Sequence, residues 1–217
     1  ETRGGMMKYG IPGYRTPRDV LDGEINRIVD MGVEIKLNTW VGKDITVEQL
    51  EKDYDAILWA VGAQAGRQLP IPGAEEAPNV LTGVDFLEAF NDGRLQLVTE
   101  KVVVVGGGDT SIDVASVARR LGRIENIADK DRPENIVLGH TAHDVASSAV
   151  RQGADVMLLS RSPIDKMPAA EHEREDALRE GVEIVGCITP VKVLVDDNGR
   201  AKALQVQKLE DDGKTPI

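Results

Sequence analysis

One stretch of the sequence constrains the fold more than any other, and it reads KVVVVGGGDTSIDVASVARRLG over residues 101–122. Val102 to Val105 predict a buried β-strand, and the segment from Ser111 to Leu121 predicts a helix. Three glycines join the two. A strand that turns through glycine into a helix points several backbone N–H groups and the positive helix end at one spot. The stretch therefore predicts the first half of a βαβ unit with a phosphate-binding turn.

The spacing of these glycines approaches the dinucleotide fingerprint GxGxxG. Gly106 permits the tight turn, and Gly108 lets a pyrophosphate approach the backbone. The third glycine of the fingerprint would fall at position 111, where Ser111 is still small enough for close packing of helix on strand. We expect a dinucleotide site here, and the alternative is a glycine turn with a purely structural role.

The end of the next predicted strand, from Asp155 to Arg161, indicates which nucleotide is bound. An NAD site usually places Asp or Glu there for the ribose hydroxyls, whereas an NADP site uses Arg for the 2′-phosphate. Here Arg161 ends the strand, and no acidic residue follows until Asp165. Guanidinium pairs with phosphate through a forked, charge-assisted contact. The sequence favours NADP(H), with NAD(H) as the alternative.

Around this unit, the periodicity predicts an α/β fold with a parallel sheet, flanking helices and a β-hairpin. Predicted helices cover residues 16–31, 46–54, 83–93 and 169–181, and predicted strands cover residues 33–41, 55–63 and 182–187, with a hairpin at 191–209. A proline-rich loop or hinge covers residues 68–79. We expect the boundary between two parts of the chain near residues 95–100.

A second segment is similar in sequence to the predicted helix that follows the glycine turn. Residues 109–122 and 140–153 match at eight of fourteen positions. Two Ala/Ser-rich helices that pack closely would explain the match, and so would a local duplication that lengthens the crossover at about residues 123–153. Only the first copy follows three glycines, so only the first is expected to hold phosphate.

Composition excludes several classes of function. The net charge of −11 argues against a nucleic-acid partner, because phosphate binding needs a basic face. No apolar run approaches the ~20 residues that a membrane helix needs. Cys187 is the single cysteine and the three histidines form no metal-ligand pattern with it, so we expect no metal site. With no signal peptide visible, we expect a cytoplasmic protein.

Five motifs in register resemble the glutamate synthase small-subunit family and related NAD(P)H-dependent flavin oxidoreductases. GGMMKYGIPGYRTP at residues 4–17 is similar to GGMxxYGIPxYRLP, and VVVVGGGDTSIDVA at residues 102–115 is similar to VxVxGGGNTAxDxA. YDAILWAVGA at residues 54–63 looks like the strand that returns to the flavin, and LPIPG at residues 69–73 like the hinge. MPAAEHEREDALREGV at residues 167–182 is similar to MPAxxxEixxAxxEGV.

The resemblance implies a pyridine nucleotide-disulfide oxidoreductase-like fold of two dinucleotide-binding domains, one for FAD and one for NAD(P)H. It implies a partial FAD-type domain and hinge at residues 1–98 and a Rossmann-like NAD(P)H domain at residues 99–217. The residues implied beside the flavin are Gly4, Gly5, Met6 and Gly62. Those implied at the NAD(P)H pyrophosphate are Gly106, Gly107, Gly108, Asp109 and Thr110.

The chain departs from the family pattern in ways that affect cofactor binding. The family's YRR at the 2′-phosphate becomes Ser160, Arg161 and Ser162, which removes one arginine. Asp109 stands where the family commonly has Asn, which still permits capping of the helix start. No flavin-type GxGxxG is present, so the chain resembles the middle of a larger flavoprotein.

The function implied is the NAD(P)H-binding portion of a flavin-dependent oxidoreductase. Hydride would pass from NAD(P)H to FAD, and electrons would continue to an iron–sulfur domain or a partner subunit. The cofactors carry this chemistry, so we expect no catalytic side chain. The alternatives are a flavin-free NAD(P)-dependent dehydrogenase and a non-catalytic module that senses NAD(P)H or scaffolds a complex.

Overall fold

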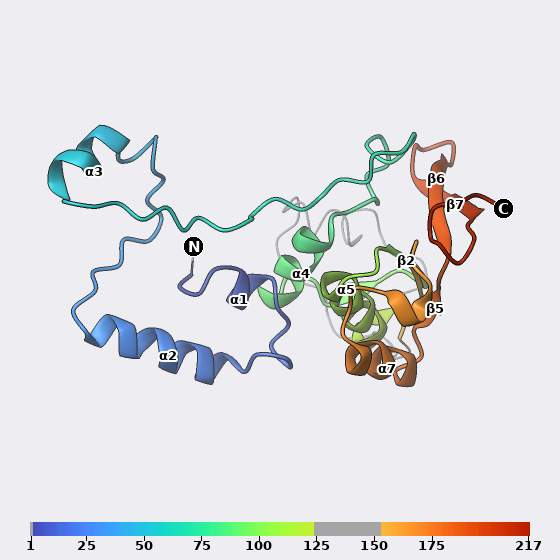
Figure 1. The fold of residues 1–217 in the computed structure, drawn as a ribbon, viewed down its shortest axis with the longest axis horizontal. Coiled ribbons are helices and arrows are strands. Elements are labelled where there is room, and N and C mark those ends of the chain that lie inside the picture. The colour runs from blue at the N-terminus through green and yellow to red at the C-terminus, as the bar shows by residue number, and fades with distance from the viewer. Residues whose placement is uncertain (1, 124–152) are drawn as a thin grey trace. The chain divides into compact units, whose positions relative to one another are not determined.

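The computed structural model describes residues 2–123 and 153–217 (Figure 1). The chain divides into two compact units, Glu1–Gln64 and Ala65–Ile217. The predicted extended crossover and the second copy of the helix motif lie largely outside the described residues.

The second unit is built on a parallel three-stranded sheet, as predicted for a βαβ unit. Its strands are β2 (Lys101–Val105), β4 (Asp155–Leu159) and β5 (Glu183–Val185), in the order β2-β4-β5. Val105 pairs with Leu159 and Leu159 with Val185, so the carboxyl ends of all three strands lie along one edge. Two shorter strands, β1 (Leu97–Val98) and β3 (Gly122–Arg123), form a separate parallel pair.

Helix α5 (Asp109–Arg120) is the centre of the hydrophobic core. Every residue from Ile112 to Ala118 is buried, because the helix packs against the sheet and against two other helices, α4 (Gly83–Asn91) and α7 (Glu171–Arg179) (Figure 1). Ile112 and Val117 of α5 are fully buried with Leu158 of β4. The predicted α/β fold, with a parallel sheet and flanking helices, is confirmed.

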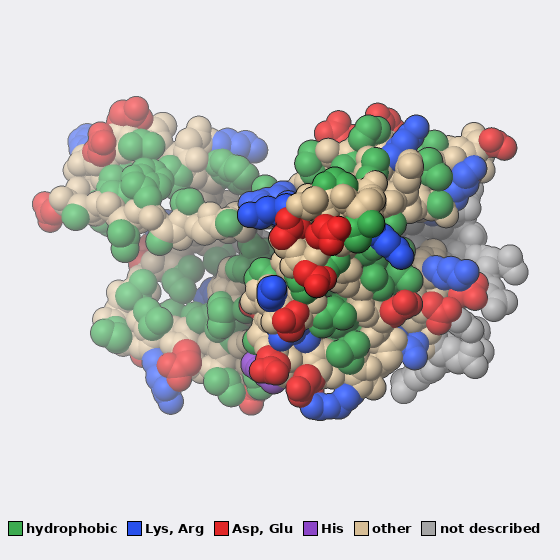
Figure 2. Space-filling model, turned by 45° about the vertical axis from the view of Figure 1, so that its right-hand side comes forward, with side chains coloured by type: hydrophobic (Ala, Val, Ile, Leu, Met, Phe, Trp, Pro, Cys, Tyr) green, Lys and Arg blue, Asp and Glu red, His purple; other side chains and the backbone are tan. Residues whose placement is uncertain are grey.

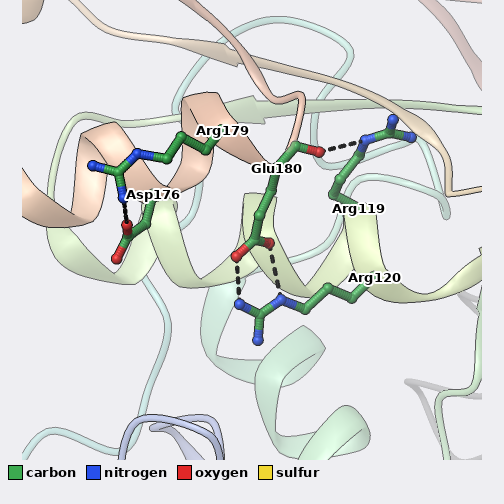
Figure 3. A network of polar contacts seen from close by, with 5 residues as sticks. All are labelled: Arg119, Arg120, Asp176, Arg179 and Glu180. Atoms are coloured by element: carbon green, nitrogen blue, oxygen red, sulfur yellow. Dashed lines mark hydrogen bonds and ion pairs between the residues drawn. The ribbon is translucent and has the colours of Figure 1, made fainter.

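Two arginines fix the far end of α5 (Figure 3). The Arg119 guanidinium donates to the carbonyl oxygen of Glu180 at 2.9 Å, as Figure 3 shows, and to that of Ala154 at 3.0 Å. The neighbouring Arg120 forms a two-pronged ion pair with the Glu180 carboxylate. The two side chains therefore tie the end of α5 to the end of α7 and to the start of β4.

The proline-rich loop packs on the predicted hairpin. The hairpin consists of β6 (Ile188–Val195) and β7 (Ala201–Lys208), which are antiparallel. The Val193 N–H donates to the Pro72 carbonyl at 2.9 Å, and Asn79 and Ala201 exchange two hydrogen bonds at 2.8 and 3.0 Å. The residues predicted as a loop or hinge therefore form part of the second unit.

The first unit contains three helices, α1 (Met6–Tyr9), α2 (Arg18–Asp30) and α3 (Val47–Asp53). Helix α2 lies where the periodicity predicted it. Thr46 and Gln49 form a reciprocal capping box that starts α3.

The strands predicted at residues 33–41 and 55–63 are not formed in this unit, so these two predictions are wrong. Both segments are extended, but within the described residues they form no strand, and Val41 makes only one isolated bridge, to Ile45. Leu58, Trp59 and Trp40 are 89%, 55% and 69% exposed, so these large apolar side chains lie at the surface of this unit. A strand needs a neighbouring strand for its backbone groups and a layer for its apolar face, and the described part of this unit supplies neither.

Candidate functional site

The three glycines of the predicted turn differ in what a side chain would meet at each position. Gly106 has a φ of +146°, which an L-residue rarely adopts, and a Cβ there would collide with the Ser111 hydroxyl. At Gly107, a Cβ would lie 2.6 Å from Ser160 Oγ, so a side chain is excluded by the packing beneath the turn. At Gly108 a Cβ would meet nothing within 4 Å. The turn is thus packed on its inner side and open at Gly108.

The open side of the turn coincides with the start of α5. Gly108 is the N-cap residue, with φ −96° and ψ 173°, and no side chain caps the helix. Within the described chain, the backbone N–H groups of Gly107, Gly108, Asp109 and Thr110 donate no hydrogen bond. Four donors at the positive end of a helix dipole form a ready site for an anion. An open cradle of backbone donors fits the pyrophosphate of a dinucleotide.

Asp109 has a different role from the one expected. It is the first residue of α5, and its carboxylate does not cap that helix. Instead, Asp109 Oδ1 accepts a hydrogen bond of 3.1 Å from the backbone N–H of Ala170, 61 residues along the chain. The expected capping by Asp109 is therefore wrong, because α5 starts two residues earlier than predicted and places this side chain inside its first turn.

The structure brings the glycine turn and Arg161 to the same edge of the sheet. The Gly106 N–H donates to the Leu159 carbonyl at 2.9 Å, so the turn leaves β2 directly beside the end of β4. Arg161 follows two residues later, is exposed, and makes no hydrogen bond or ion pair with another described residue. Its guanidinium is available for an anion at this edge, where ligands of open α/β sheets bind.

The two serines that flank Arg161 are placed differently from it. Ser160 is 2% exposed and its hydroxyl lies under Gly107, where it supports the turn. Ser162 is half-buried, and its carbonyl accepts a hydrogen bond of 3.3 Å from the Cys187 N–H. Arg161 is therefore the residue of this trio best placed to reach a bound ligand.

An acidic turn lies beside Arg161. A Cβ at Gly213 would be 2.8 Å from the Arg161 carbonyl oxygen, so the two backbones are in close contact. The Thr215 hydroxyl and nearby backbone N–H groups donate to the Asp212 carboxylate and lower its pKa to about 2. Burial, followed by the charge of Asp211, raises the pKa of the Cys187 thiol. The thiol is consequently protonated at neutral pH.

The residues implied beside the flavin all lie in the first unit. Gly4 has a φ of +109° and packs on α2, where a Cβ would meet Ile25 and Leu21 at 3.3 and 3.4 Å. Gly5 precedes Met6, the first residue of α1. Gly62 has a φ of +69°, and two residues later Gln64 accepts a hydrogen bond from the Tyr9 hydroxyl at the end of α1. This contact links the segment of Gly62 to the helix that starts at Met6.

Other kinds of site find no support in the described part of the chain. Its His, Cys, Asp and Glu residues include no group of three that could hold a metal ion. None of its helices has the length and apolarity needed to cross a membrane. On the face drawn in Figure 2, acidic and basic side chains are interspersed over the described residues. That pattern fits the net charge of −11 and differs from the basic face that nucleic acids require.

A sequence profile of the pyridine nucleotide-disulphide oxidoreductase family matches residues 3–215. The chain belongs to this family. It is 36% identical over 209 residues to the beta subunit of an NADP(+)-dependent formate dehydrogenase from Moorella thermoacetica, covering 95% of this chain and 25% of that protein. It is 33% identical over 208 residues to the beta subunit of an NADPH-Fe(3+) oxidoreductase from Geobacter sulfurreducens, covering 95% and 26%.

The resemblance to glutamate synthase small subunits is confirmed as well. A putative glutamate synthase [NADPH] small chain from Cereibacter sphaeroides is 29% identical over 216 residues, covering 95% of this chain and 45% of that one. This member of the family thus spans between a quarter and just under half of the length of these relatives.

Solved structures agree on the fold. FprA, an oxidoreductase from Mycobacterium tuberculosis, superposes with a TM-score of 0.65 at 17% identity, covering 98% of this chain and 57% of that one. A 2-naphthoyl-CoA reductase superposes with a TM-score of 0.59, also at 17% identity, covering 100% and 26%. The α/β fold of this family member therefore matches that of the reductases.

Sequence reasoning missed the support beneath the glycine turn. The loop at residues 167–170 and the buried Ser160 both contact Gly107, where they exclude any larger residue. The MPAA motif marked this loop as a family feature, but its contact with the turn comes from tertiary structure. The sequence signal that could have indicated a supporting role is the position of Ser160, a small residue directly after the apolar run at residues 156–159.

Proposed function

We propose that this chain is the NAD(P)H-binding portion of a flavin-dependent oxidoreductase, with a preference for NADP(H). The observation that carries the proposal is the open cradle at Gly108. Its N–H groups, which bond to no other described residue, lie at the same sheet edge as Arg161, which likewise has no partner among the described residues. The cradle suits a pyrophosphate, and the guanidinium suits a 2′-phosphate. In this arrangement the described side chains bind and orient the nucleotide, and none is needed as an acid, base or nucleophile.

We assign residues 1–98 to a partial FAD-type domain and hinge, and residues 99–217 to the NAD(P)H domain. Two features support the first assignment: the left-handed glycines Gly4, Gly5 and Gly62, and the exposed apolar segment at residues 55–63, which suits a strand in a larger sheet. When bound, the flavin would supply the acceptor for hydride. The two compact units of the structure divide at Gln64, not at residue 98. The reason is that α4 lies between these two positions and packs on α5, which places it in the second unit.

We further propose that electrons continue from the flavin to an iron–sulfur domain or a partner subunit. The support is that the relatives from Moorella and Geobacter are named as beta subunits, and so work beside at least one other chain. The net charge of −11 would favour a partner with a basic docking face. A reducing cytoplasm is the compartment that suits its single free thiol.

Calorimetric titration of the 217-residue chain with NADPH and with NADH tests the nucleotide assignment. We expect NADPH to bind roughly tenfold more tightly than NADH, the lower end of what a charge-assisted contact provides. Arg161→Ala should weaken NADPH to the level of NADH and leave NADH nearly unchanged. Lys202→Ala, which removes an exposed cation on β7, is the matched control and should change neither. Equal binding of both nucleotides by the wild-type chain would refute the assignment to NADP(H).

A further inference from the structure

The loop at residues 167–170 packs and hydrogen-bonds against the inner side of the glycine turn, the side on which Ser160 lies under Gly107. This loop joins the short 3₁₀ helix η2 (Ile164–Lys166) to α7. Its Ala169 N–H donates to the Gly107 carbonyl at 3.0 Å, and its Ala170 N–H donates to Asp109 Oδ1 at 3.1 Å. Pro168 lies beside the turn, since its Cδ would be 3.5 Å from a Cβ on Gly107. The loop therefore contacts both the backbone of the glycine turn and the side chain of Asp109 that follows it.

One side chain of α7 holds the loop in place. Arg174 Nη1 donates to the carbonyl oxygens of Ala169 at 2.6 Å and Met167 at 3.2 Å. Met167 and Ala169 are themselves buried, so the two carbonyls depend on this guanidinium in place of water.

The hydrogen bond from Ala169 to the Gly107 carbonyl determines the direction of the Gly108 N–H, which is one of the donors of the anion cradle. In a trans peptide, the C=O of one residue and the N–H of the next point in opposite directions. The described chain contains no cis peptide. Because Ala169 holds the Gly107 carbonyl from the inner side, the N–H of Gly108 is turned to the outer side, which is the open one. The loop therefore pre-orients a donor of the anion cradle.

We propose that Arg174 is a positioning residue for the dinucleotide pyrophosphate, acting through residues 167–170 on Gly107 and Asp109. The proposal rests on the proposed nucleotide site and adds the element that keeps its donors aligned. It also gives Asp109 a role, because its carboxylate accepts the Ala170 N–H and so ties the loop to the first residue of α5.

The pyrophosphate is common to both nucleotides, so the proposal predicts a signature that differs from that of Arg161. Arg174→Ala should weaken NADPH and NADH by the same factor, roughly tenfold, and leave their ratio unchanged. Arg174→Lys keeps a donor within reach of the two carbonyls and should restore a large part of the affinity. Arg179→Ala, on the same helix and paired only with exposed Glu175 and Asp176, is the matched control and should bind like the wild type.

A double-mutant cycle tests the contact between the loop and Asp109. Ala170 has φ −58° and ψ 141°, which a proline accepts, so Ala170→Pro removes the N–H donor with little backbone strain. Asp109→Ala removes the acceptor. We expect Ala170→Pro and Asp109→Ala each to weaken both nucleotides severalfold, and the double variant to be no weaker than either single variant. Fully additive losses would overturn the contact.

Hydrogen exchange separates failure of this proposal from failure of the nucleotide site. The exchange rate of the Ala169 amide, which donates to the Gly107 carbonyl, should rise in Arg174→Ala in the unliganded chain, at a temperature where thermal melting shows both proteins folded. If the wild-type chain binds neither nucleotide, the proposed function fails, while faster exchange still supports the grip on the turn. Unchanged exchange, or unchanged affinity in Arg174→Ala when the wild type binds, would overturn the positioning role.

Discussion

Placing a methyl group on Gly108 should separate nucleotide binding from folding. The residue has an extended backbone, with φ −96° and ψ 173°, and a Cβ there meets no atom within 4 Å. Gly108→Ala therefore introduces neither strain nor a collision in the unliganded protein. The added methyl group does, however, occupy the open side of the turn, where a pyrophosphate must approach the backbone.

The effect of this methyl group on stability and its effect on nucleotide binding differ in sign and in size. Replacing a glycine by alanine in a compatible conformation stabilises a protein by about 0.4–1 kcal/mol, through the entropy of the unfolded chain. A hydrogen bond to a charged group contributes about 1.5–3 kcal/mol, so the loss of one such contact weakens binding roughly ten- to hundredfold. Gly108→Ala should therefore melt at the wild-type temperature or slightly above it while losing most of its affinity for NADPH and NADH alike.

Two companion variants complete this test. Gly106→Ala should lower the melting temperature, because its φ is +146° and a Cβ meets Ser111. Gly23→Ala places a methyl group in open space on α2 and should leave nucleotide affinity intact. Calorimetric titration and thermal melting of the three variants give all the numbers needed. Wild-type affinity in Gly108→Ala would refute the assignment of this turn to the pyrophosphate.

Three further predictions follow from the described structure. Arg119→Ala should lower the free energy of unfolding in urea by about 2 kcal/mol, because two carbonyls lose their donor. The control is Arg120→Ala, which breaks a half-exposed ion pair and should cost about 1 kcal/mol or less. A loss in Arg119→Ala no larger than that of the control would contradict the packing described. The pKa of Asp212 should be about 2 when its carboxyl carbon is followed by NMR. Its contribution to the stability of the turn is therefore complete above pH 3.8 and is lost as the pH falls through about 2. A midpoint near 3.8 would contradict the hydrogen bonds from Thr215. The purified 217-residue chain should be colourless, because residues 33–41 and 55–63 form no sheet around a flavin, and a stoichiometric yellow chromophore would count against this expectation.

The second unit was predictable largely because its signals are local. Four consecutive valines, three glycines and an Ala-rich amphipathic helix specify β2, the turn and α5 within about twenty residues of sequence. The availability of Arg161 could be predicted too, because it follows a strand whose apolar run is unambiguous. The hairpin of β6 and β7 was predictable from the turn at residues 197–199, where Gly199 has a φ of +74°.

The remaining features depend on contacts between distant residues, which periodicity does not report. The apolar alternation at residues 55–63 shows that the segment prefers a buried sheet, but strand pairing also requires neighbours, and within the described unit Leu58 and Trp59 stay exposed. The hydrogen bond from Ala170 to Asp109 spans 61 residues. Without knowing that α7 starts beside the glycine turn, Asp109 could only be interpreted as a local helix cap.

The most direct test of the proposed nucleotide site is an NMR titration with 2′-phospho-ADP-ribose, the part of NADPH that lacks nicotinamide. This ligand presents the pyrophosphate and the 2′-phosphate, but it needs no flavin and no electron acceptor. The account predicts saturable shifts of the backbone amides of Gly107, Gly108, Asp109 and Thr110 together with the Arg161 guanidinium, and weaker binding of ADP-ribose without the guanidinium shift. Saturable shifts elsewhere in the chain, with these amides unmoved, would contradict it.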